Sequence, residues 1–486
     1  MNETVRPRHC RLHSFLHGTA VFLASSAVLL SPWAFSAWEV WMFWPLAAAV
    51  FAAAALSGAG LAVGALTGGA RPVPLRARLF FLSCVPFLAW AAVRAFRPSA
   101  PGFPLVAVEA ERSVLLFLLP VLLALTFAVS SGPRFRRVFP RLFLADAVAV
   151  CACALWYHFT TDDLRILWMP GMPYTGRASA PFWCPNHFVD YAFWGGFVAL
   201  SAALAPRVGF LRRAVLLLVF AFCSAAAFFS LSRGGIVSAA AGCLLVLPFL
   251  GLSGRRPWLR AVFALTVFCG VAGAALAVRY TDNPVMRRVE KEGLWKVWKD
   301  AKTPSDLLED APRLLARNFN RGQYISAALR AWRSNPDEGI GPGQHTHRWA
   351  QFEPTDEGVR PTGPDGAGLV RPQFADYGKH LYEVHSDWVQ LLEEYGTRGL
   401  LLFLPPFLLL LAALVVRHCR TFAAGGPLLE RTSPLAALLC LVSLAVHSTV
   451  DFTLLIPCAG WTLAAICSVA MLAEPEPEAR KQGDAA

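Results

Sequence analysis

Residues 383–400, EVHSDWVQLLEEYGTRGL, decide the fold because they lead a long polar excursion, 279–395, back into apolar sequence. Before residue 279 the chain consists of apolar runs joined by short loops, so only this excursion is large enough to form a sizeable water-facing subdomain. Ser386 is a plausible helix N-cap, and Trp388, Leu391, Leu392 and Tyr395 fall on one face of the helix that would follow. The stretch therefore predicts a helix that leads directly into a membrane span.

The composition indicates a polytopic membrane protein. Of 486 residues, 56% are hydrophobic and only 16% are charged, which is too apolar for a soluble chain of this length. The net charge of +12 does not indicate nucleic acid as a partner, because the 279–395 excursion is nearly neutral, with 16 Lys/Arg against 18 Asp/Glu. The positive excess lies on short loops, as the positive-inside bias of membrane proteins produces.

Apolar runs long enough to cross a hydrocarbon core of about 30 Å recur along the chain. We expect twelve transmembrane helices, near 15–35, 41–64, 79–96, 114–130, 142–160, 187–205, 214–230, 235–252, 261–278, 398–416, 434–449 and 452–472. The predicted organisation is spans one to nine in 1–278, a loop subdomain in 279–397, spans ten to twelve in 398–472 and a disordered tail in 473–486. The fold class is an all-α polytopic membrane protein with one large, mainly helical loop.

Arginines occupy every second loop and set the orientation. They gather at 71–78, 134–141, 207–213, 255–260 and 417–431, and the N-terminal arginines fall on the same side. The alternation predicts cytoplasmic termini and an outward-facing excursion. Within the excursion we expect an amphipathic helix at 284–301, a second helix at about 305–334 that ends before Pro336 and GIGPG, and an irregular loop at 346–379.

Polar residues that could carry chemistry lie where outward loops meet the membrane. The first cluster is PYTGRASAPFWCPNHFVDY, 173–191, with Arg177, Asn186, His187 and Asp190. The second is SLSRGG, 230–235, a turn so short that Arg233 must lie close to the bilayer. An arginine at membrane depth costs about 2.5–3.5 kcal/mol by insertion scales, so Arg233 either binds a ligand, pairs with Asp190 or extends its side chain to water. Its planar, permanent charge suits phosphate oxygens.

The third cluster is the excursion itself, with Arg317, Arg321, His345, His347 and His385. Arg317 and Arg321 are four residues apart, so they present either a basic binding edge or a solvated helix face. His385 is either a structural residue or a general base for a sugar hydroxyl. The second role is possible because an imidazole has a pKa of about 6.5 in water. Asp387 either orients His385 or favours the helix N-terminus.

Metal chemistry has weak support in the sequence. His345 and His347 could pair on a metal, but no acidic cluster accompanies them, and none of the twelve cysteines forms a CxxC pair. We therefore expect no metal and no cofactor.

Three stretches together resemble the O-antigen ligase and O-antigen polymerase family. They are RASAPFWCPNHFVDY (177–191), SLSRGG (230–235), and RGQYISAALRAWRSNPDEGIGPGQH (321–345) followed by HSDWVQLLEEYGTRGLLLF (385–403). Each is moderately specific alone, and their order, spacing and side of the membrane strengthen the likeness, which covers about 173–416. The resemblance implies a GT-C-like architecture in the bacterial inner membrane, with the large loop in the periplasm.

The resemblance also implies a reaction and its residues. Such proteins take a glycan from undecaprenyl diphosphate and transfer it to an acceptor hydroxyl without a nucleotide sugar, generally without a metal. By motif, Arg233 and Arg321 would hold the diphosphate and His385 would activate or position the acceptor, with inversion at the anomeric carbon. Arg177, Asn186, Arg317, His345 and Asp387 are further candidates for substrate binding, and membrane lipids are expected neighbours.

The acceptor stays open at the level of sequence. Ligases often have Asn after the motif histidine where this chain has Ser386, and the 346–379 insert is long for a simple ligase. A ligase, a polymerase and a protein O-glycosyltransferase all fit the donor motifs. A transporter or flippase of lipid-linked sugars is the alternative from another class, although neither an internal repeat nor a second large loop is evident.

Overall fold

The computed structural model describes a bundle of long helices. It covers residues 9–67, 73, 75–97, 105–161, 165–167, 169–170, 176–247, 320–352, 383–422 and 426–472. The first half comprises α1 (His9–Leu30), η1 (Phe35–Ala37), α2 (Val40–Leu66), α3 (Leu75–Phe96), α4 (Ala107–Ser130), α5 (Pro133–Thr160), a hairpin of β1 (Arg165–Ile166) and β2 (Met169–Pro170), α6 (Pro185–Leu204), α7 (Phe210–Phe229) and α8 (Arg233–Val246). The second half comprises α13 (Asn320–Ser334), α14 (His345–Arg348), η3 (Trp349–Gln351), α15 (Asp387–Thr421), α16 (Leu428–His447), η5 (Thr453–Leu455) and α17 (Pro457–Leu472).

The described helices confirm an all-α polytopic membrane protein. Eight of them are long and apolar enough to cross a membrane, and α8 and α17 are shorter apolar helices. Eleven of the twelve predicted spans coincide with α1 to α8 and α15 to α17, whereas the predicted span at 261–278 lies outside the described residues. The predicted helix at 284–301 and most of the predicted 305–334 helix also lie outside them, and α13 is the described end of the latter.

The loop prediction at 346–379 is wrong in its first residues. Residues 345–351 form α14 and η3, because side chains in them find buried places that a solvated loop would not offer. Trp349 is buried and its ring lies edge-on to Tyr324 of α13, at 5.8 Å between centroids. Residues 353–382 lie outside the described part of the chain.

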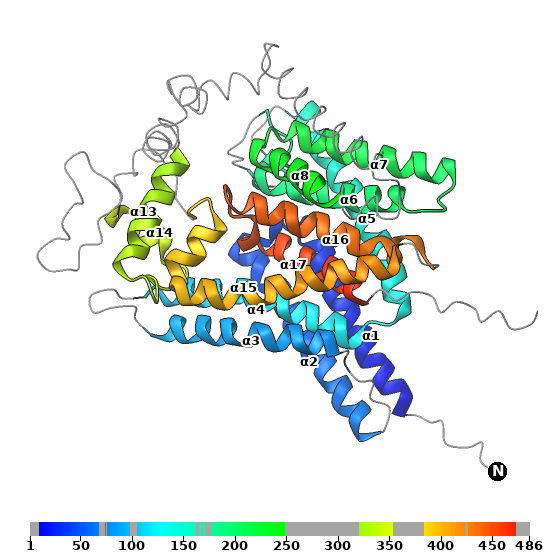
Figure 1. Ribbon diagram of the computed structural model, residues 1–486, viewed down its shortest axis with the longest axis horizontal. Coiled ribbons are helices and arrows are strands. Elements are labelled where there is room, and N and C mark those ends of the chain that lie inside the picture. The colour runs from blue at the N-terminus through cyan, green and yellow to red at the C-terminus, as the bar shows by residue number, and fades with distance from the viewer. Residues whose placement is uncertain are drawn as a thin grey trace, which may run out of the picture.

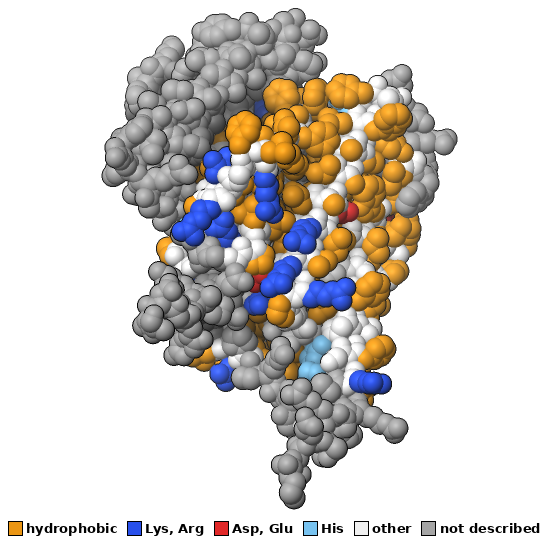
Figure 2. Space-filling model, turned by 90° about the vertical axis from the view of Figure 1, so that its right-hand side faces the viewer, with side chains coloured by type: hydrophobic (Ala, Val, Ile, Leu, Met, Phe, Trp, Pro, Cys, Tyr) orange, Lys and Arg blue, Asp and Glu red, His pale blue; other side chains and the backbone are white. Residues whose placement is uncertain are grey.

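The helices run side by side, with α13 and α14 gathered at one end of the bundle (Figure 1). Arginines gather at the opposite end, and Figure 2 shows their side chains spread across that face. Several donate to the last carbonyls of neighbouring helices, which completes the hydrogen bonding of helix ends. Arg417 donates to Met471 O at 3.0 and 2.8 Å, and Arg213 donates to Ala203 O at 3.1 Å.

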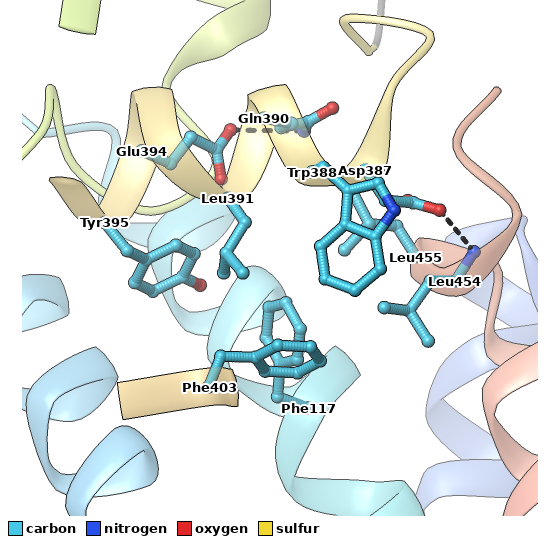
Figure 3. Close-up of a pocket in the computed structure, with 10 residues that line it drawn as sticks. All are labelled: Phe117, Asp387, Trp388, Gln390, Leu391, Glu394, Tyr395, Phe403, Leu454 and Leu455. Atoms are coloured by element: carbon cyan, nitrogen blue, oxygen red, sulfur yellow. Dashed lines mark hydrogen bonds between the residues drawn. The ribbon is translucent and has the colours of Figure 1, made fainter. Parts of the chain in front are cut away.

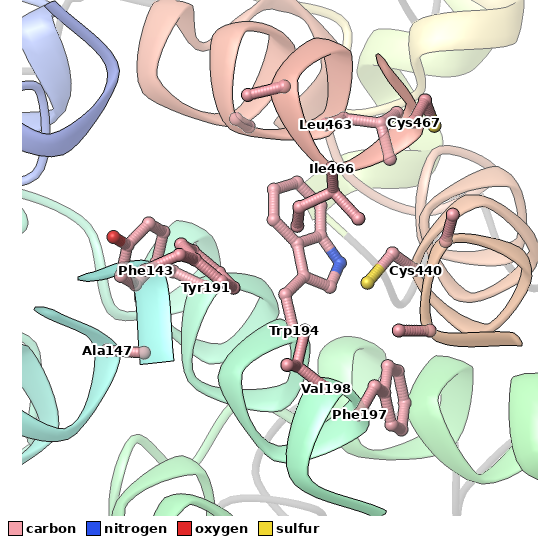
Figure 4. Close-up of a cluster of buried hydrophobic side chains, with 14 of the residues drawn as sticks. Phe143, Ala147, Tyr191, Trp194, Phe197, Val198, Cys440, Leu463, Ile466 and Cys467 are labelled. Carbon is pink, nitrogen blue, oxygen red and sulfur yellow. The ribbon is translucent and has the colours of Figure 1, made fainter. Parts of the chain in front are cut away.

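The core lies where α5, α6, α16 and α17 meet around Trp194, whose ring is fully buried (Figure 4). Glycines let the helices approach closely on this side. A Cβ at Gly195 would lie 2.5 Å from Ala147 Cβ, and one at Gly235 would lie 2.0 Å from Val189 Cγ1. Small residues at helix contacts are a common means of tight packing within membranes.

Helix α15 joins the predicted loop helix and the tenth span into one element, with a sharp kink at Gly396. The kink releases three carbonyls from the helical ladder, and each finds another donor. Ile340 N donates to Glu393 O at 2.8 Å, Gly341 N to Glu394 O at 3.0 Å, and Trp90 Nε1 to Tyr395 O at 3.0 Å. The GIGPG segment therefore supplies backbone donors for carbonyls that the kink leaves without helical partners, and buried carbonyls need such partners.

Gly396 should be irreplaceable at this kink. Its φ of 71° and ψ of −178° suit glycine alone, and an added Cβ would lie 2.3 Å from Asp337 O. We expect Gly396→Ala to cost about 1–3 kcal/mol or more of stability, measured as a lower thermal unfolding midpoint in detergent. Gly58→Ala is the control, because nothing lies within 4 Å of its Cβ position in α2. Equal midpoints for the two variants would contradict this account of the kink.

Candidate functional site

The candidate site lies at the end of the bundle that carries α13 and α14. Four segments meet there: the start of α6 with the turn before it, the turn into α8, the residues that enter α15, and the turn from α16 to η5. The first three carry the clusters predicted from the sequence. The fourth, HSTVDF at 447–452, supplies the carboxylate that connects them.

His385 stands immediately before α15 in an unusual backbone conformation. Its φ is +61°, a region that non-glycine residues rarely adopt, and Ser386 then caps the helix by accepting from Val389 N at 3.4 Å. The imidazole is about 25% exposed and lies between the rings of Tyr324 and Phe452, with centroids 5.9 and 5.0 Å away. Strained residues of this kind often mark functional sites.

Asp451 holds the His385 ring from one side. The two side chains meet between His385 Nδ1 and Asp451 Oδ1 at 3.3 Å, and the carboxylate is 1% exposed. Phe452 N also donates to Oδ1, at 3.0 Å. Because Asp451 occupies Nδ1, the other ring nitrogen, Nε2, is left without a hydrogen-bond partner among the described residues.

A second chain of hydrogen bonds reaches Asp451 from the turn before α6. Arg177 is buried and donates from Nη2 to Asn186 Oδ1 at 2.9 Å, and Asn186 Nδ2 donates to Asp451 Oδ2 at 2.8 Å. Arg177 Nε also donates to Ser230 O at 2.6 Å. The predicted residues Arg177 and Asn186 are thereby joined both to His385 and to the turn that carries Arg233.

Arg233 is the first residue of α8 and is half-buried. The glycines that follow it bring the helix start against the site, because Gly234 faces the His447 ring and Gly235 faces Val189 of α6. Asp190, the predicted partner of Arg233, lies 2.6 Å from His447 Nδ1 through its Oδ2. Arg321 lies in α13 without a described side chain, and Arg317 lies outside the described residues.

Asp387, two residues after His385, is buried and connects the start of α15 to neighbouring segments. Its Oδ2 accepts from Ser448 Oγ at 2.6 Å and from Leu454 N at 2.9 Å, and the residue is 4% exposed. Figure 3 shows the bond to Leu454 beside Trp388, whose Nε1 donates to Ala445 O at 2.9 Å. These bonds fix the start of α15 against α16 and η5, and so fix the height of His385.

His345 is buried in a second polar cluster. Its Nδ1 lies 2.8 Å from Glu393 Oε2, and both side chains are at most 1% exposed. Glu394 accepts from the backbone N–H groups of Gly343 and His345, at 2.9 and 3.4 Å, which ties the start of α14 to α15. Burial lowers the pKa of Arg348, at the end of α14, to about 10, so its guanidinium stays charged near neutral pH.

Glu383 begins the segment that leads to His385. Its carboxylate accepts from Gln390 Nε2, and the Gln390 Oε1 accepts from Val384 N at 3.1 Å. Burial and the neighbouring Glu394 raise the pKa of Glu383 well above its usual value. The carboxyl group therefore retains a proton to higher pH than an exposed glutamate would.

A large apolar cavity lies next to the segments that position His385, because Trp388, Ser448 and Leu454 are among its lining residues. It has a volume of about 880 Å³ and runs between α3, α4, α15, α16 and α17. Its apolar wall includes Phe80, Phe87, Phe403, Leu410, Leu444 and Ala464. Ser448 and Leu454, which bond Asp387, therefore also form part of the cavity wall.

Sequence reasoning missed Asp451, His447 and Ser448. All three lie in or beside the short turn between two strongly apolar runs, where a charged residue is costly and therefore informative. The available signal was the sequence HSTVD itself, which places a histidine and an aspartate four residues apart between the last two spans.

Metal ligation has no support among the described residues, where no group of three or more His, Cys, Asp or Glu side chains could hold an ion. His345 is bonded to Glu393 and His347 is exposed, so they do not form a pair of ligands there. The metal independence of the reaction stays a prediction.

Comparison with known proteins agrees with the resemblance. Residues 218–404 match the model of a family described as O-antigen ligase, which includes the SLSRGG turn, Arg321, His345 and His385. The cluster at 177–191 and the turn at 447–452 lie outside the matched segment. A search of curated proteins gave no match. The match confirms the family resemblance and supports a glycan-transferring function in a membrane.

The buried contact between His345 and Glu393 and an exposed ion pair nearby should differ in their contribution to stability. Removing Glu393 leaves His345 Nδ1 buried without this partner, and an unsatisfied buried polar group costs about 1–3 kcal/mol, so we expect Glu393→Ala to reduce stability by about that amount. Asp337→Ala is the matched control, because its pair with Arg398 is exposed, at 70% and 54%, and should contribute less than about 1 kcal/mol. Thermal unfolding in detergent distinguishes them. A larger loss for Asp337→Ala would show that the His345–Glu393 pair does not anchor the loop.

Proposed function

From the O-antigen ligase match of residues 218–404, we propose that this chain transfers a glycan from undecaprenyl diphosphate to an acceptor hydroxyl. The transfer would take place at the end of the bundle where His385, Asp451, Arg177 and Arg233 gather. By the positive-inside bias, the arginine-rich opposite end is cytoplasmic and the site is periplasmic. The enzyme would act in the bacterial inner membrane.

The observation that carries the proposal is the His385–Asp451 pair. A buried carboxylate at Nδ1 would fix the tautomer and the orientation of the imidazole, which is about 25% exposed, and would leave Nε2 available to a substrate. The same division of roles between an orienting carboxylate and a proton-accepting histidine recurs in unrelated hydrolases. His385 would accept the proton of the acceptor hydroxyl through Nε2.

Arginines would supply the complementary electrostatics. As the acceptor oxygen forms its bond to the anomeric carbon, the bond between that carbon and the diphosphate oxygen breaks, and undecaprenyl diphosphate leaves with the electron pair. Arg233, at the start of α8, and Arg321, on α13, would hold the diphosphate and stabilise the charge that it gains. Attack from the side opposite the leaving group inverts the anomeric configuration.

The apolar cavity supports a lipid substrate. Its lining from Leu75 to Leu88 on α3 covers 13 residue steps, or about 20 Å along the helix, a length that suits a hydrocarbon chain. Its lining includes Ser448, which bonds Asp387 at the start of α15, close to His385. A lipid chain in this cavity would bring its headgroup to the level of the site. Ligase, polymerase and protein O-glycosyltransferase activities differ in the acceptor and share this donor chemistry.

The first test is transfer in a bacterial strain that lacks this protein, with variants compared at matched membrane abundance. We expect His385→Ala to reduce transfer by about 10²–10⁴-fold and Arg233→Ala by about 10²–10³-fold, because they remove the base and a charge on the leaving group. Asp451→Asn should also reduce it. Polysaccharide released from the carrier is resolved by gel, where single additions indicate a ligase and ladders indicate a polymerase.

The control variants also replace a histidine or an arginine with alanine, but at positions away from the proposed site. His347→Ala and Arg333→Ala remove exposed side chains on the same end of the molecule and should retain transfer. Full transfer by His385→Ala and Arg233→Ala would show that the proposed site is wrong, and would favour a transporter of lipid-linked sugars.

Filling the apolar cavity should weaken substrate binding. We expect Ala464→Trp to raise the KM for the lipid substrate about tenfold, which corresponds to about 1.4 kcal/mol of lost binding. Ala52→Trp places the same side chain at an exposed position of α2 and is the control. The measurement is the rate of transfer against lipid substrate concentration in detergent. Unchanged kinetics for Ala464→Trp would exclude the cavity as the lipid site.

A further inference from the structure

The turn between α6 and α7, residues 205–209, lies at the end of the bundle opposite the candidate site (Figure 1). Helix α6 begins at the site with Pro185 and reaches this turn 20 residues later, which corresponds to about 30 Å along the helix. Arg207 stands in the turn, and Arg212 and Arg213 stand in the first turn of α7. The chemistry proposed for the site uses none of these three arginines.

Two arginines beside the turn are committed to backbone carbonyls. Arg213 donates from Nε to Ala203 O at 3.1 Å and from Nη2 to Ala205 O at 3.3 Å. Arg431 of α16 donates from Nη2 to Pro206 O at 2.7 Å. These bonds complete the hydrogen bonding at the end of α6 and hold the turn against α16.

Arg207 and Arg212 are not committed in this way. Both are exposed, and neither forms a hydrogen bond or an ion pair with the residues that the structure describes. Their positive charges lie close enough to repel the guanidinium of Arg431. Glu430 is the one acidic side chain among the described residues at this end, and it pairs with Arg136 at 3.1 Å. The turn therefore carries a local excess of positive charge.

The backbone at Arg207 is strained. Its φ is +61°, in the left-handed region that favours glycine, yet the glycine of this turn stands two residues later, at position 209. Residues held in such a conformation reduce the stability of the fold and cluster at sites that bind ligands. A large charged side chain at this position thus agrees with a binding role.

Exposed apolar side chains begin immediately beside the two arginines. Phe210 is 89% exposed and Leu211 is 76% exposed, and Leu211, Val215 and Leu218 share one face of α7 at helical spacing. Because α7 is long and apolar enough to cross a membrane, this face suits hydrocarbon chains. Figure 2 shows basic and hydrophobic side chains next to one another on this end of the molecule.

We propose that the α6–α7 turn binds an anionic phospholipid, with the lipid phosphate on Arg207 and Arg212 and the acyl chains along the exposed apolar face of α7. A guanidinium binds phosphate oxygens through charge-assisted hydrogen bonds, and basic pockets beside transmembrane helices suit anionic headgroups. Hydrocarbon contact beside the same arginines selects a lipid over a soluble phosphate. The proposal goes beyond the proposed function and does not rest on it, because the turn lies at the other end of the bundle from His385.

The test measures lipid binding by the full-length protein in a neutral detergent. Dioleoyl phosphatidylglycerol is titrated and the bound lipid is counted by native mass spectrometry, with dioleoyl phosphatidylcholine as a probe that has the same chains and no net charge. We expect Arg207→Gln and Arg212→Gln each to raise the apparent Kd for phosphatidylglycerol about fivefold, which corresponds to about 1 kcal/mol for each arginine. Binding of phosphatidylcholine should stay close to that of the wild type.

Two controls remove the same charge elsewhere. Arg134→Gln combined with Arg137→Gln changes exposed arginines of α5 at the same end of the bundle, and Arg333→Gln changes an exposed arginine of α13 at the other end. Both controls should bind phosphatidylglycerol as the wild type does. Equal weakening by the α5 variant would show that the lipid responds to the overall charge of this end, and would refute the assignment to the turn.

Arg207→Gly separates lipid binding from folding. Glycine suits the φ of +61° and removes the guanidinium, so this variant should keep its thermal unfolding midpoint without lipid and still lose about fivefold in affinity. A lower midpoint with unchanged affinity is what a purely structural role predicts. Inorganic phosphate at the same concentration as the lipid should not displace it. Displacement by phosphate would show a simple anion site and overturn the lipid proposal.

Discussion

A single buried carboxylate, that of Asp451, joins the parts of the candidate site. Asn186 brings the turn before α6 to it, His385 brings the entry into α15, and His447 brings the end of α16. Each of these side chains lies near the end of a different helix, and a buried carboxylate is stable only when neighbouring polar groups compensate for the water that it has lost. The contacts of Asp451 therefore fix both the relative positions of these helix ends and the arrangement of polar groups in the site.

Close helix packing makes this geometry possible. The glycines at 195, 234, 235 and 396 are not interchangeable, because each removes a specific obstacle: a methyl group of α5, a histidine ring, a valine of α6, or the backbone of the loop. Dispersion forces act within a few ångströms, and without a hydrophobic drive between helices in lipid such contacts contribute much of their association. The site thus depends on small residues as much as on its charged ones.

The sequence predicted the apolar helices well because hydrocarbon thickness imposes a length on each apolar run. Eleven predicted spans coincide with described helices, and eight of these helices are long and apolar enough to cross a membrane. Capping and periodicity predicted the helix that follows Ser386. The predicted topology also placed Arg177, Asn186, Arg233 and His385 on the same side of the membrane. It could not predict that Asp451 links them, because pairing between residues separated by 66 or 265 positions leaves no trace in local pattern. Short helices such as α14 also escaped, since their stability comes from burial against α13 and α15 rather than from propensity.

The arginines at the end of the bundle opposite the site have two physical roles, one through their charge and one through their hydrogen bonds. During synthesis their positive charge is what a membrane-insertion apparatus counts, whereas in the finished fold Arg417 and Arg213 are hydrogen-bond donors to the carbonyls that end α17 and α6. The same arginines thus add positive charge to the loops and complete the hydrogen bonding at the ends of helices. Lysine would keep the positive charge but lose the forked geometry with which Arg417 donates twice to Met471 O.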